Sequence, residues 1–343
     1  KLHGIRLTDG GEILKIEEQS QEITWAQELI RQSWSYRAAR VLQVACALGL
    51  FTRLGEEGAT AAQIAADEGW DADRIEGLLI ACAAMELVER DGEGWTLTAR
   101  GAATMLPAAP LYQGNAIAHS TDVWNFWDGL EQTMRGEERS AAVGEGGARR
   151  HSHRDFILAM HDMAMAGRAA RLATCVDLNN RHRLVDVGGG PGTYTIALCQ
   201  RYPELCGAIF DLPETIAIAR EVIDRFGMAD RISTVEGSWD EDEFGEGVDA
   251  ILMSNVLHGP GSGADMKLAK AYRALVDGGL LILQDFLLNV DKTGPLNPAL
   301  FNIMVGAYSI DELCDVVREA GFSDLQLQPM PEDLGTSLLT AVK

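Results

Sequence analysis

The stretch LVDVGGGPGTY, residues 184–194, places a glycine loop directly after a short apolar run. Its G-x-G-x-G pattern begins at Gly188 and includes Gly190. Glycines at such a place let the backbone turn tightly and approach a ligand closely. Asp186 lies within the apolar run, and Asp211 ends the next such run, in IFDLPE. Because a carboxylate at that second place accepts hydrogen bonds from a ribose diol, the pattern predicts a nucleoside-containing cofactor.

From this stretch to the end of the chain, short β-type runs alternate with helical runs. The strand candidates are RLVDVG, GAIFDL, ISTVEG, VDAILMSNVL, GGLLILQDF, FSDLQLQP and SLLTAVK. This alternation predicts a parallel, doubly wound α/β sheet, which binds ligands outside the carboxyl ends of its strands. The spacing GGGPG departs from G-x-G-x-x-G and the loop lies mid-chain, so the pattern favours S-adenosylmethionine over NAD.

Residues 20–106, ahead of the loop, have a different pattern that is mostly helical. Helix, turn, helix and a hairpin at DGEG follow one another, as in a winged helix, with Asp71 as a predicted N-cap. Residues 1–100 contain ten Lys or Arg against seventeen Asp or Glu, and the whole chain has a net charge of −22. Such a surface repels phosphate, so we expect a dimerisation module, with no nucleic acid or anionic membrane as partner.

The bulk composition indicates a cytoplasmic protein. The chain has 343 residues and no uninterrupted apolar stretch of about 18, which a membrane span requires. Its polar N-terminus lacks the apolar core of a signal peptide. The six cysteines form no CxxC pair, and no His, Cys or carboxylate cluster has ligand spacing, so we expect neither disulfides nor a metal site.

Several segments together resemble the S-adenosylmethionine-dependent small-molecule O-methyltransferases of the caffeate and polyketide type. These segments are DVGGGPG, FDLP, AILMSNVLH, GGLLILQD and EAGF. The resemblance implies a homodimer with a class I methyltransferase fold, a Rossmann-like sheet whose last strand is antiparallel, and methyl transfer to a small acceptor. We divide the chain into a helical winged-helix dimerisation domain (1–110), a helical linker or lid (111–183) and a cofactor-binding catalytic domain (184–343).

The resemblance also implies which residues hold the cofactor. The set is Asp186, Gly188, Gly190, Asp211, Leu212, Ser238, Trp239 and Ser254. Within it, Asp211 would hold the ribose and Leu212 would touch the adenine. Ser238 and Trp239 stand where the family usually has Asp-Met or Asp-Phe beside the adenine, and Ser254 stands at a position that is often Lys.

His258, in SNVLHGPG, matches the general base of the family, and Asp285 matches the carboxylate that positions it. Two features depart from the family's pattern. Gly259 and Pro260 replace the usual Asp-Trp, and Ala307 stands in VGAYSIDEL where a second carboxylate is usual. The base is therefore kept while its surroundings are rebuilt.

Three functions fit this pattern. A thioether sulfur attacks a methyl group without losing a proton, so a rebuilt base site fits S-methylation. The whole chain resembles marine bacterial S-methyltransferases that act on 4-methylthio-2-hydroxybutyrate on the way to dimethylsulfoniopropionate, and we favour that reaction here. The alternative is O-methylation of an aromatic or polyketide hydroxyl with His258 as base. The third is a non-catalytic winged-helix regulator that senses the cofactor.

The acceptor site is predicted from the segment between the two domains. The candidates are His161, Trp127, Met160, Arg154, Trp34 and Tyr36. His161 and Met160 lie in AMHDM, where the family lines its acceptor pocket. Trp127 is expected to form an apolar wall or to favour a developing sulfonium. The cation or donor for an acceptor carboxylate is expected among His119, His153, Arg154, His161 and Arg168. Trp34 and Tyr36 would reach in from a partner subunit. We expect a polar, flexible loop at 136–150.

Overall fold

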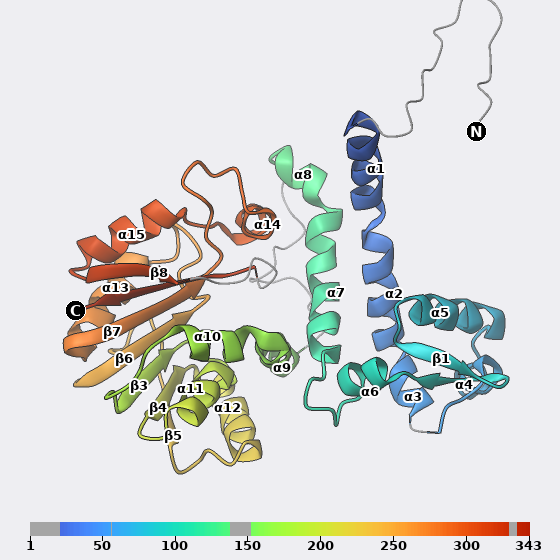
Figure 1. Cartoon of the computed structure of the whole chain (residues 1–343), viewed down its shortest axis with the longest axis horizontal. Helices are drawn as coiled ribbons and strands as arrows, with labels where there is room; N and C mark the ends of the chain where they lie inside the picture. The colour runs from blue at the N-terminus through green and yellow to red at the C-terminus, as the bar shows by residue number, and fades with distance from the viewer. Residues whose placement is uncertain (1–20, 56, 138–151, 329–334) are drawn as a thin grey trace, which may run out of the picture.

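A computed structural model of the chain describes residues 21–55, 57–137, 152–328 and 335–343. Most of the loop expected at 136–150 lies outside these ranges. Figure 1 shows a helical N-terminal part, a C-terminal part built on a sheet, and the long helix α7 standing between them.

The N-terminal part consists of short helices and a two-stranded hairpin. Its elements are α1 (Gln21–Trp34), α2 (Tyr36–Ala47), α3 (Leu50–Leu54), α4 (Ala61–Glu68), α5 (Ala72–Ala84), β1 (Val88–Asp91), β2 (Gly94–Leu97) and α6 (Ala99–Met105). Asp71 caps α5, because its side chain accepts hydrogen bonds from the backbone N–H groups of Asp73 and Arg74. Strands β1 and β2 pair antiparallel across the predicted turn. The winged-helix arrangement predicted for this part is therefore confirmed.

A run of helices connects the two parts. It comprises α7 (Gly114–Asp128), α8 (Leu130–Met134), α9 (His153–Met163), the π-helical turn η1 (Ala164–Arg168) and α10 (Ala169–Cys175). Helix α7 contacts both α2 and α9. The buried Asp162 accepts hydrogen bonds from the backbone N–H groups of Asn115 (2.9 Å) and Ala116 (3.3 Å) at the start of α7. These bonds satisfy helix-terminal donors and fix α9 against α7.

The C-terminal part alternates strands and helices as predicted. Its elements are β3 (Arg183–Val187), α11 (Thr193–Arg201), β4 (Cys206–Asp211), α12 (Pro213–Arg225), β5 (Ile232–Glu236), β6 (Val248–Ser254), α13 (Ala264–Ala274), β7 (Leu275–Asp285), α14 (Leu296–Val305), α15 (Ile310–Glu319), β8 (Ser323–Gln328) and β9 (Ser337–Val342). The sheet order is β5-β4-β3-β6-β7-β9-β8. Strand β9 pairs antiparallel with both of its neighbours, whereas the other pairs are parallel. This topology confirms the expected fold class. The order of strands reverses between β3 and β6, and sheets of this kind bind ligands at such a point.

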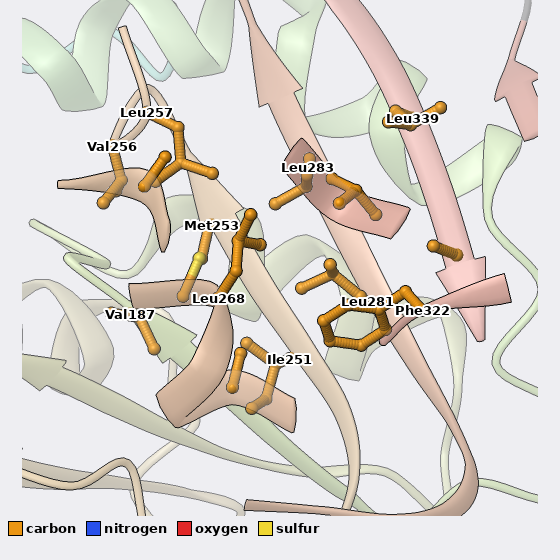
Figure 2. Packing of buried hydrophobic residues seen from close by; sticks show 14 of the residues in the cluster. Val187, Ile251, Met253, Val256, Leu257, Leu268, Leu281, Leu283, Phe322 and Leu339 are labelled. Carbon is orange, nitrogen blue, oxygen red and sulfur yellow. The ribbon is translucent and has the colours of Figure 1, made fainter. Parts of the chain in front are cut away.

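Both faces of the sheet are buried, which explains why its central strands read as continuous apolar runs. On β6, Ile251 and Met253 point to the face covered by α13 and α15, whose packing Figure 2 shows. Ala250 and Leu252 alternate with them and join the core under α10, α11 and α12. The carboxyl ends of the strands, rather than either face, are therefore free to carry a site.

In the described ranges, no helix is both long enough and apolar enough to cross a membrane. No group of three or more metal-binding side chains gathers among the same residues. The six cysteines all lie in the described ranges, and none of them forms a disulfide there.

Candidate active site

The glycine loop lies between β3 and α11 at the carboxyl edge of the sheet. Gly188 and Gly190 both have positive φ, at +67° and +56°. A residue with a side chain adopts such a φ only at a cost in free energy. A Cβ added at Gly188 would lie 2.7 Å from the ring of Trp239, so the loop is packed tightly there. Around Gly190, no atom would lie within 4 Å of an added Cβ. The loop is therefore open at Gly190, where a ligand can approach its backbone.

Asp211, at the end of β4, holds this loop in place. One carboxylate oxygen accepts a hydrogen bond from the backbone N–H of Gly190 (2.8 Å), and the other from that of Leu212 (2.7 Å). Each carboxylate oxygen has a second lone pair, so Asp211 retains acceptors for a ribose diol. Leu212 is 45% exposed beside it, as an adenine contact requires.

Asp186 lies buried beneath the glycine loop. Its carboxylate accepts a hydrogen bond from the hydroxyl of Thr195 (2.7 Å), while its other oxygen, Oδ1, has no partner among the described residues. Burial, with a smaller contribution from the negative charge of Asp211, raises the pKa of Asp186 to about 7, against the opposing effect of the Thr195 bond. A buried acceptor without a partner costs free energy unless a ligand supplies a donor. The ammonium group of S-adenosylmethionine is such a donor, so the residues present fit this cofactor.

Trp239 is held against the loop by two lysines of α13. The Lys270 ammonium donates a hydrogen bond to the backbone carbonyl of Trp239 (2.8 Å), and the Lys267 ammonium lies 4.4 Å from the indole centroid. Both lysines are buried, yet the indole is 36% exposed. The ring thus has a fixed orientation and a free face for an adenine. Its neighbour Ser238 accepts a hydrogen bond from Asp240 within the same turn.

Two residues that the sequence reading missed lie beside Ser254, at the end of β6. The Gln284 side-chain amide donates to the hydroxyls of Tyr194 (2.8 Å) and Ser254 (3.1 Å). Tyr194 is the second residue of α11, directly after the loop, and Gln284 is fully buried in β7. A glutamine inside the apolar run LLILQD was a signal for this network, since a buried amide needs partners. The position that is often Lys in the family thus belongs here to a neutral hydrogen-bonding network.

The predicted catalytic pair lies at the ends of β6 and β7. The Nδ1 atom of His258 is 3.0 Å from the carboxylate of Asp285. Asp285 is buried and also accepts hydrogen bonds from the backbone N–H groups of Leu257 (3.1 Å) and Phe286 (2.8 Å). With its Nδ1–H directed at the carboxylate, neutral His258 has Nε2 left as a proton acceptor. The histidine side chain is 32% exposed, so that nitrogen is within reach of a ligand.

Aromatic rings and a small-residue segment surround His258. The ring of Phe301, on α14, lies 5.1 Å from that of His258, and Phe286 stacks on Phe301 at 3.9 Å. A Cβ added at Gly259 would lie 3.1 Å from the backbone nitrogen of Ala307. The segment that carries a second carboxylate in the family therefore packs with its backbone against Gly259, the residue after His258, and has Ala307 at that place.

His161 lies on the cofactor side of the site. It is buried on α9, and its Nδ1 is 2.7 Å from the hydroxyl of Thr193, the first residue of α11. Burial, together with the nearby positive charge of Arg225, lowers the pKa of His161 to about 4. This contact ties His161 to the glycine-loop helix, and Met160 precedes His161 on α9. The structure thus places His161 against the glycine-loop helix, and its predicted contact with the acceptor stays a prediction.

Arg154 does not reach the dyad. It forms a two-pronged ion pair with Glu221 of α12, in which one N–O distance is 2.9 Å and both side chains are about half exposed. This partner lies 67 positions away in the sequence, so the pattern could not reveal it. Because its charge is already matched, the predicted carboxylate-binding role of Arg154 gains no support from the structure.

The predicted aromatic residues lie on the helices between the two parts. Trp127 is half-buried on α7, edge-to-face with Phe126 at 5.0 Å. Trp34 and Tyr36 are exposed at the junction of α1 and α2, with Tyr36 6.3 Å from the ring of Trp124. Their contribution to a site through a partner subunit stays a prediction.

A separate cavity of about 330 Å³ lies at the junction of α2, α3, α6 and α7. Its lining includes Gln43, Phe51, Met105 and Tyr112. Neither the glycine loop nor the dyad borders it, so it is not the place of the chemistry.

Comparison with known proteins matches both parts of the chain to O-methyltransferases. A family model described as an O-methyltransferase domain matches residues 142–323, and one described as an O-methyltransferase dimerisation domain matches residues 31–106. The chain is 32% identical over 304 residues to the 3-hydroxy-5-methyl-1-naphthoate 3-O-methyltransferase of Streptomyces sahachiroi, covering 84% of this chain and 86% of that protein.

Two solved structures extend the likeness to nearly the whole chain. PigF with S-adenosylhomocysteine has a TM-score of 0.77 and 28% identity, covering 92% of this chain and 99% of that one. Human N-acetylserotonin methyltransferase in complex with S-adenosylmethionine has a TM-score of 0.80 and 23% identity, covering 96% and 99%. The cofactor of this chain is therefore S-adenosylmethionine, as its glycine loop predicted.

Proposed function

Because this chain belongs to the O-methyltransferase family, we propose that it transfers the methyl group of S-adenosylmethionine to a hydroxyl oxygen of a small acceptor. The observation that carries the proposal is the hydrogen bond between His258 and the buried Asp285, 3.0 Å long. A hydroxyl must lose its proton as the methyl group arrives, and this pair provides a fixed base for that proton. The chain is thus a methyltransferase, and the non-catalytic regulator is set aside.

The two residues of the pair have distinct tasks in this mechanism. The cofactor supplies an electrophilic methyl group on a sulfonium sulfur. His258 accepts the hydroxyl proton at Nε2, which makes the acceptor oxygen a better nucleophile. Asp285 fixes the tautomer of the imidazole and stabilises the imidazolium once it forms. General bases of this kind contribute about 10²–10⁴-fold in rate.

The residues around the glycine loop orient the cofactor in the same proposal. Asp211 accepts the ribose hydroxyls, Trp239 offers its exposed face to the adenine, and Asp186 accepts from the ammonium group. His161 acts through Thr193, which it holds at the start of the loop's helix. Each role fits a group that the structure leaves with spare hydrogen-bonding capacity or an exposed face.

A small aromatic acceptor and a homodimer complete the proposal. The relative from Streptomyces sahachiroi acts on a hydroxyl of a naphthoate, which Phe286 and Phe301 would suit as apolar walls. The dimerisation domain spans residues 31–106. Trp25, Leu29 and Ile30 of α1 are 51–66% exposed, and a second copy of this chain would cover them.

S-methylation of a thioether acid is the second candidate. The specific observation in its favour is Ala307, whose segment packs with its backbone against Gly259 where the family usually supplies a second carboxylate. A thioether such as 4-methylthio-2-hydroxybutyrate loses no proton, so it tolerates a reduced base network and relies on alignment. The sequence pattern favoured this reaction. We rank O-methylation first because the His258–Asp285 pair is intact, and only a hydroxyl acceptor gains rate from a base.

The test measures S-adenosylhomocysteine release from the two acceptor classes in parallel. A hydroxylated naphthoate represents the first class and 4-methylthio-2-hydroxybutyrate the second. The proposal expects release with the hydroxyl acceptor, together with a methyl ether in the product. Release with the thioether alone, yielding a sulfonium product, would transfer the assignment to the second candidate.

A further inference from the structure

Arg168 is a half-buried arginine at the end of the π-helical turn η1. The preceding Gly167 has φ of +112°, and the backbone of the turn leaves helical geometry at this point. The turn joins α9 to α10 and contacts α11, the helix that the glycine loop opens. Such turns inside helices occur frequently at functional sites, because they re-aim side chains. The turn therefore sets Arg168 beside the cofactor loop.

The surroundings of Arg168 are aromatic rather than acidic. Its guanidinium carbon lies 5.9 Å from the centroid of Phe286, which stacks on Phe301, whose ring lies 5.1 Å from that of His258. The guanidinium thus stands beside the Phe286 end of an aromatic wall, Phe286 and Phe301, and the His258 ring stands beside the Phe301 end. Burial raises the pKa of Tyr194, and the positive charge of Arg168 opposes that rise. Arg168 therefore also lies near the network of Tyr194.

No carboxylate neutralises Arg168 within the part of the chain that the structure describes. This is notable in a chain with 51 acidic and 29 basic residues, in which other arginines, such as Arg154 and Arg273, form close ion pairs. A half-buried cation without an anion has lost part of its hydration and gained no partner. The guanidinium fork matches a carboxylate in geometry and binds it with two parallel hydrogen bonds.

We propose that Arg168 is the carboxylate-binding residue of the active site, deepening and resting on the function proposed above. Two bound molecules carry a carboxylate that this residue could receive. One is the cofactor, through its amino-acid end, since Ser254 stands where a lysine is usual and the chain lacks that cation. The other is an acidic acceptor lying along the aromatic wall. The shared chemistry is one carboxylate paired with one guanidinium.

The experiment measures binding rather than turnover, so it does not depend on the methyl-accepting atom. Titration calorimetry compares S-adenosylhomocysteine with its decarboxylated analogue, 5′-(3-aminopropylthio)-5′-deoxyadenosine. A second pair, a hydroxylated naphthoate and its carboxamide, is titrated into protein saturated with S-adenosylhomocysteine. The wild type, Arg168→Gln and Arg168→Lys are compared with the control Arg201→Gln, which removes an exposed arginine at the far end of α11.

The wild type should bind the carboxylate member of at least one pair about tenfold to 100-fold more tightly than its neutral partner. Arg168→Gln should abolish that preference, Arg168→Lys should retain part of it, and Arg201→Gln should leave it unchanged. Loss of preference in the first pair assigns the carboxylate to the cofactor, and loss in the second assigns it to an acidic acceptor. A preference that survives Arg168→Gln in both pairs, or is missing from the wild type, overturns the inference. The proposed function fails separately, when no hydroxyl acceptor releases S-adenosylhomocysteine.

Discussion

His161 provides a quantitative test of how the glycine-loop helix is supported. Burial and the nearby Arg225 lower its pKa from an ordinary 6.5 to about 4, so the folded protein favours the neutral ring. A group whose pKa is lower in the folded state than in the unfolded state stabilises the fold at pH values above its unfolded-state pKa. This stabilisation is lost as the pH falls toward the folded-state pKa. Applied to these two values, linkage predicts a loss of about 2 kcal/mol at pH 5 and about 3 kcal/mol at pH 4 relative to pH 7.

The assay is urea unfolding followed by tryptophan fluorescence at pH 7, 5 and 4, for the wild type and His161→Gln. Glutamine keeps a hydrogen-bonding group near Thr193 but does not titrate. The neighbouring Asp162 acts in the opposite direction, because burial raises its pKa to about 6 and its contribution to stability grows as the pH falls. Both proteins contain Asp162, so the difference between them isolates His161. The variant should escape the acid loss, whereas His182→Gln, at an exposed histidine, should behave as the wild type. Equal losses in the wild type and His161→Gln would show that protonation of His161 does not cause the loss of stability in acid.

The remaining predictions concern the cofactor loop. Gly190→Ala and Gly227→Ala both place a side chain at positive φ in open space, so each should cost about 1–2 kcal/mol of stability. Only Gly190→Ala should also weaken binding of S-adenosylhomocysteine, by tenfold or more in calorimetry, and equal affinities would show that the cofactor does not approach Gly190. Trp239→Ala should weaken the same binding about tenfold while Trp239→Phe largely preserves it; an unchanged affinity in the alanine variant would remove the indole from the site. Burial raises the pKa of Asp186 to about 7 in the folded protein, well above its value in the unfolded chain. Ionisation of this carboxyl therefore lowers the stability of the cofactor-free protein as the pH rises from the unfolded-state pKa through 7. Asp186→Asn should therefore raise the melting temperature at pH 8 and weaken cofactor binding, and a lowered melting temperature would contradict this.

Local patterns in the sequence predicted most of the fold. The N-cap at Asp71 and the strand alternation after residue 184 depend on neighbouring residues, so they are visible in one dimension. The pairing of His258 with Asp285 was implied by the resemblance to the family. It agrees with the sheet geometry, because Asp285 ends β7 and His258 follows the end of the parallel neighbour β6 at the same edge.

Contacts that depend on tertiary structure were missed. Arg154 was expected at the acceptor, but its partner Glu221 lies on another helix, and nothing in either segment signals the pairing. His161 was assigned to the acceptor from its neighbours in sequence, whereas its ring direction brings it to Thr193. The π-helical turn that presents Arg168 has no cue stronger than a single glycine in an apolar helical run, so the backbone geometry at this place could not be predicted from the sequence.

In the proposed mechanism His258 acts as a base on a hydroxyl acceptor, and a comparison of two rates tests that role. Methyl transfer to a hydroxylated naphthoate is measured at saturating S-adenosylmethionine for the wild type and His258→Ala, with binding of S-adenosylhomocysteine as the control. We expect kcat of His258→Ala to be about 10²–10⁴-fold lower than that of the wild type, with unchanged affinity for the cofactor. A variant that keeps kcat within tenfold of the wild type would show that the histidine only orients the acceptor, and would contradict the proposed mechanism.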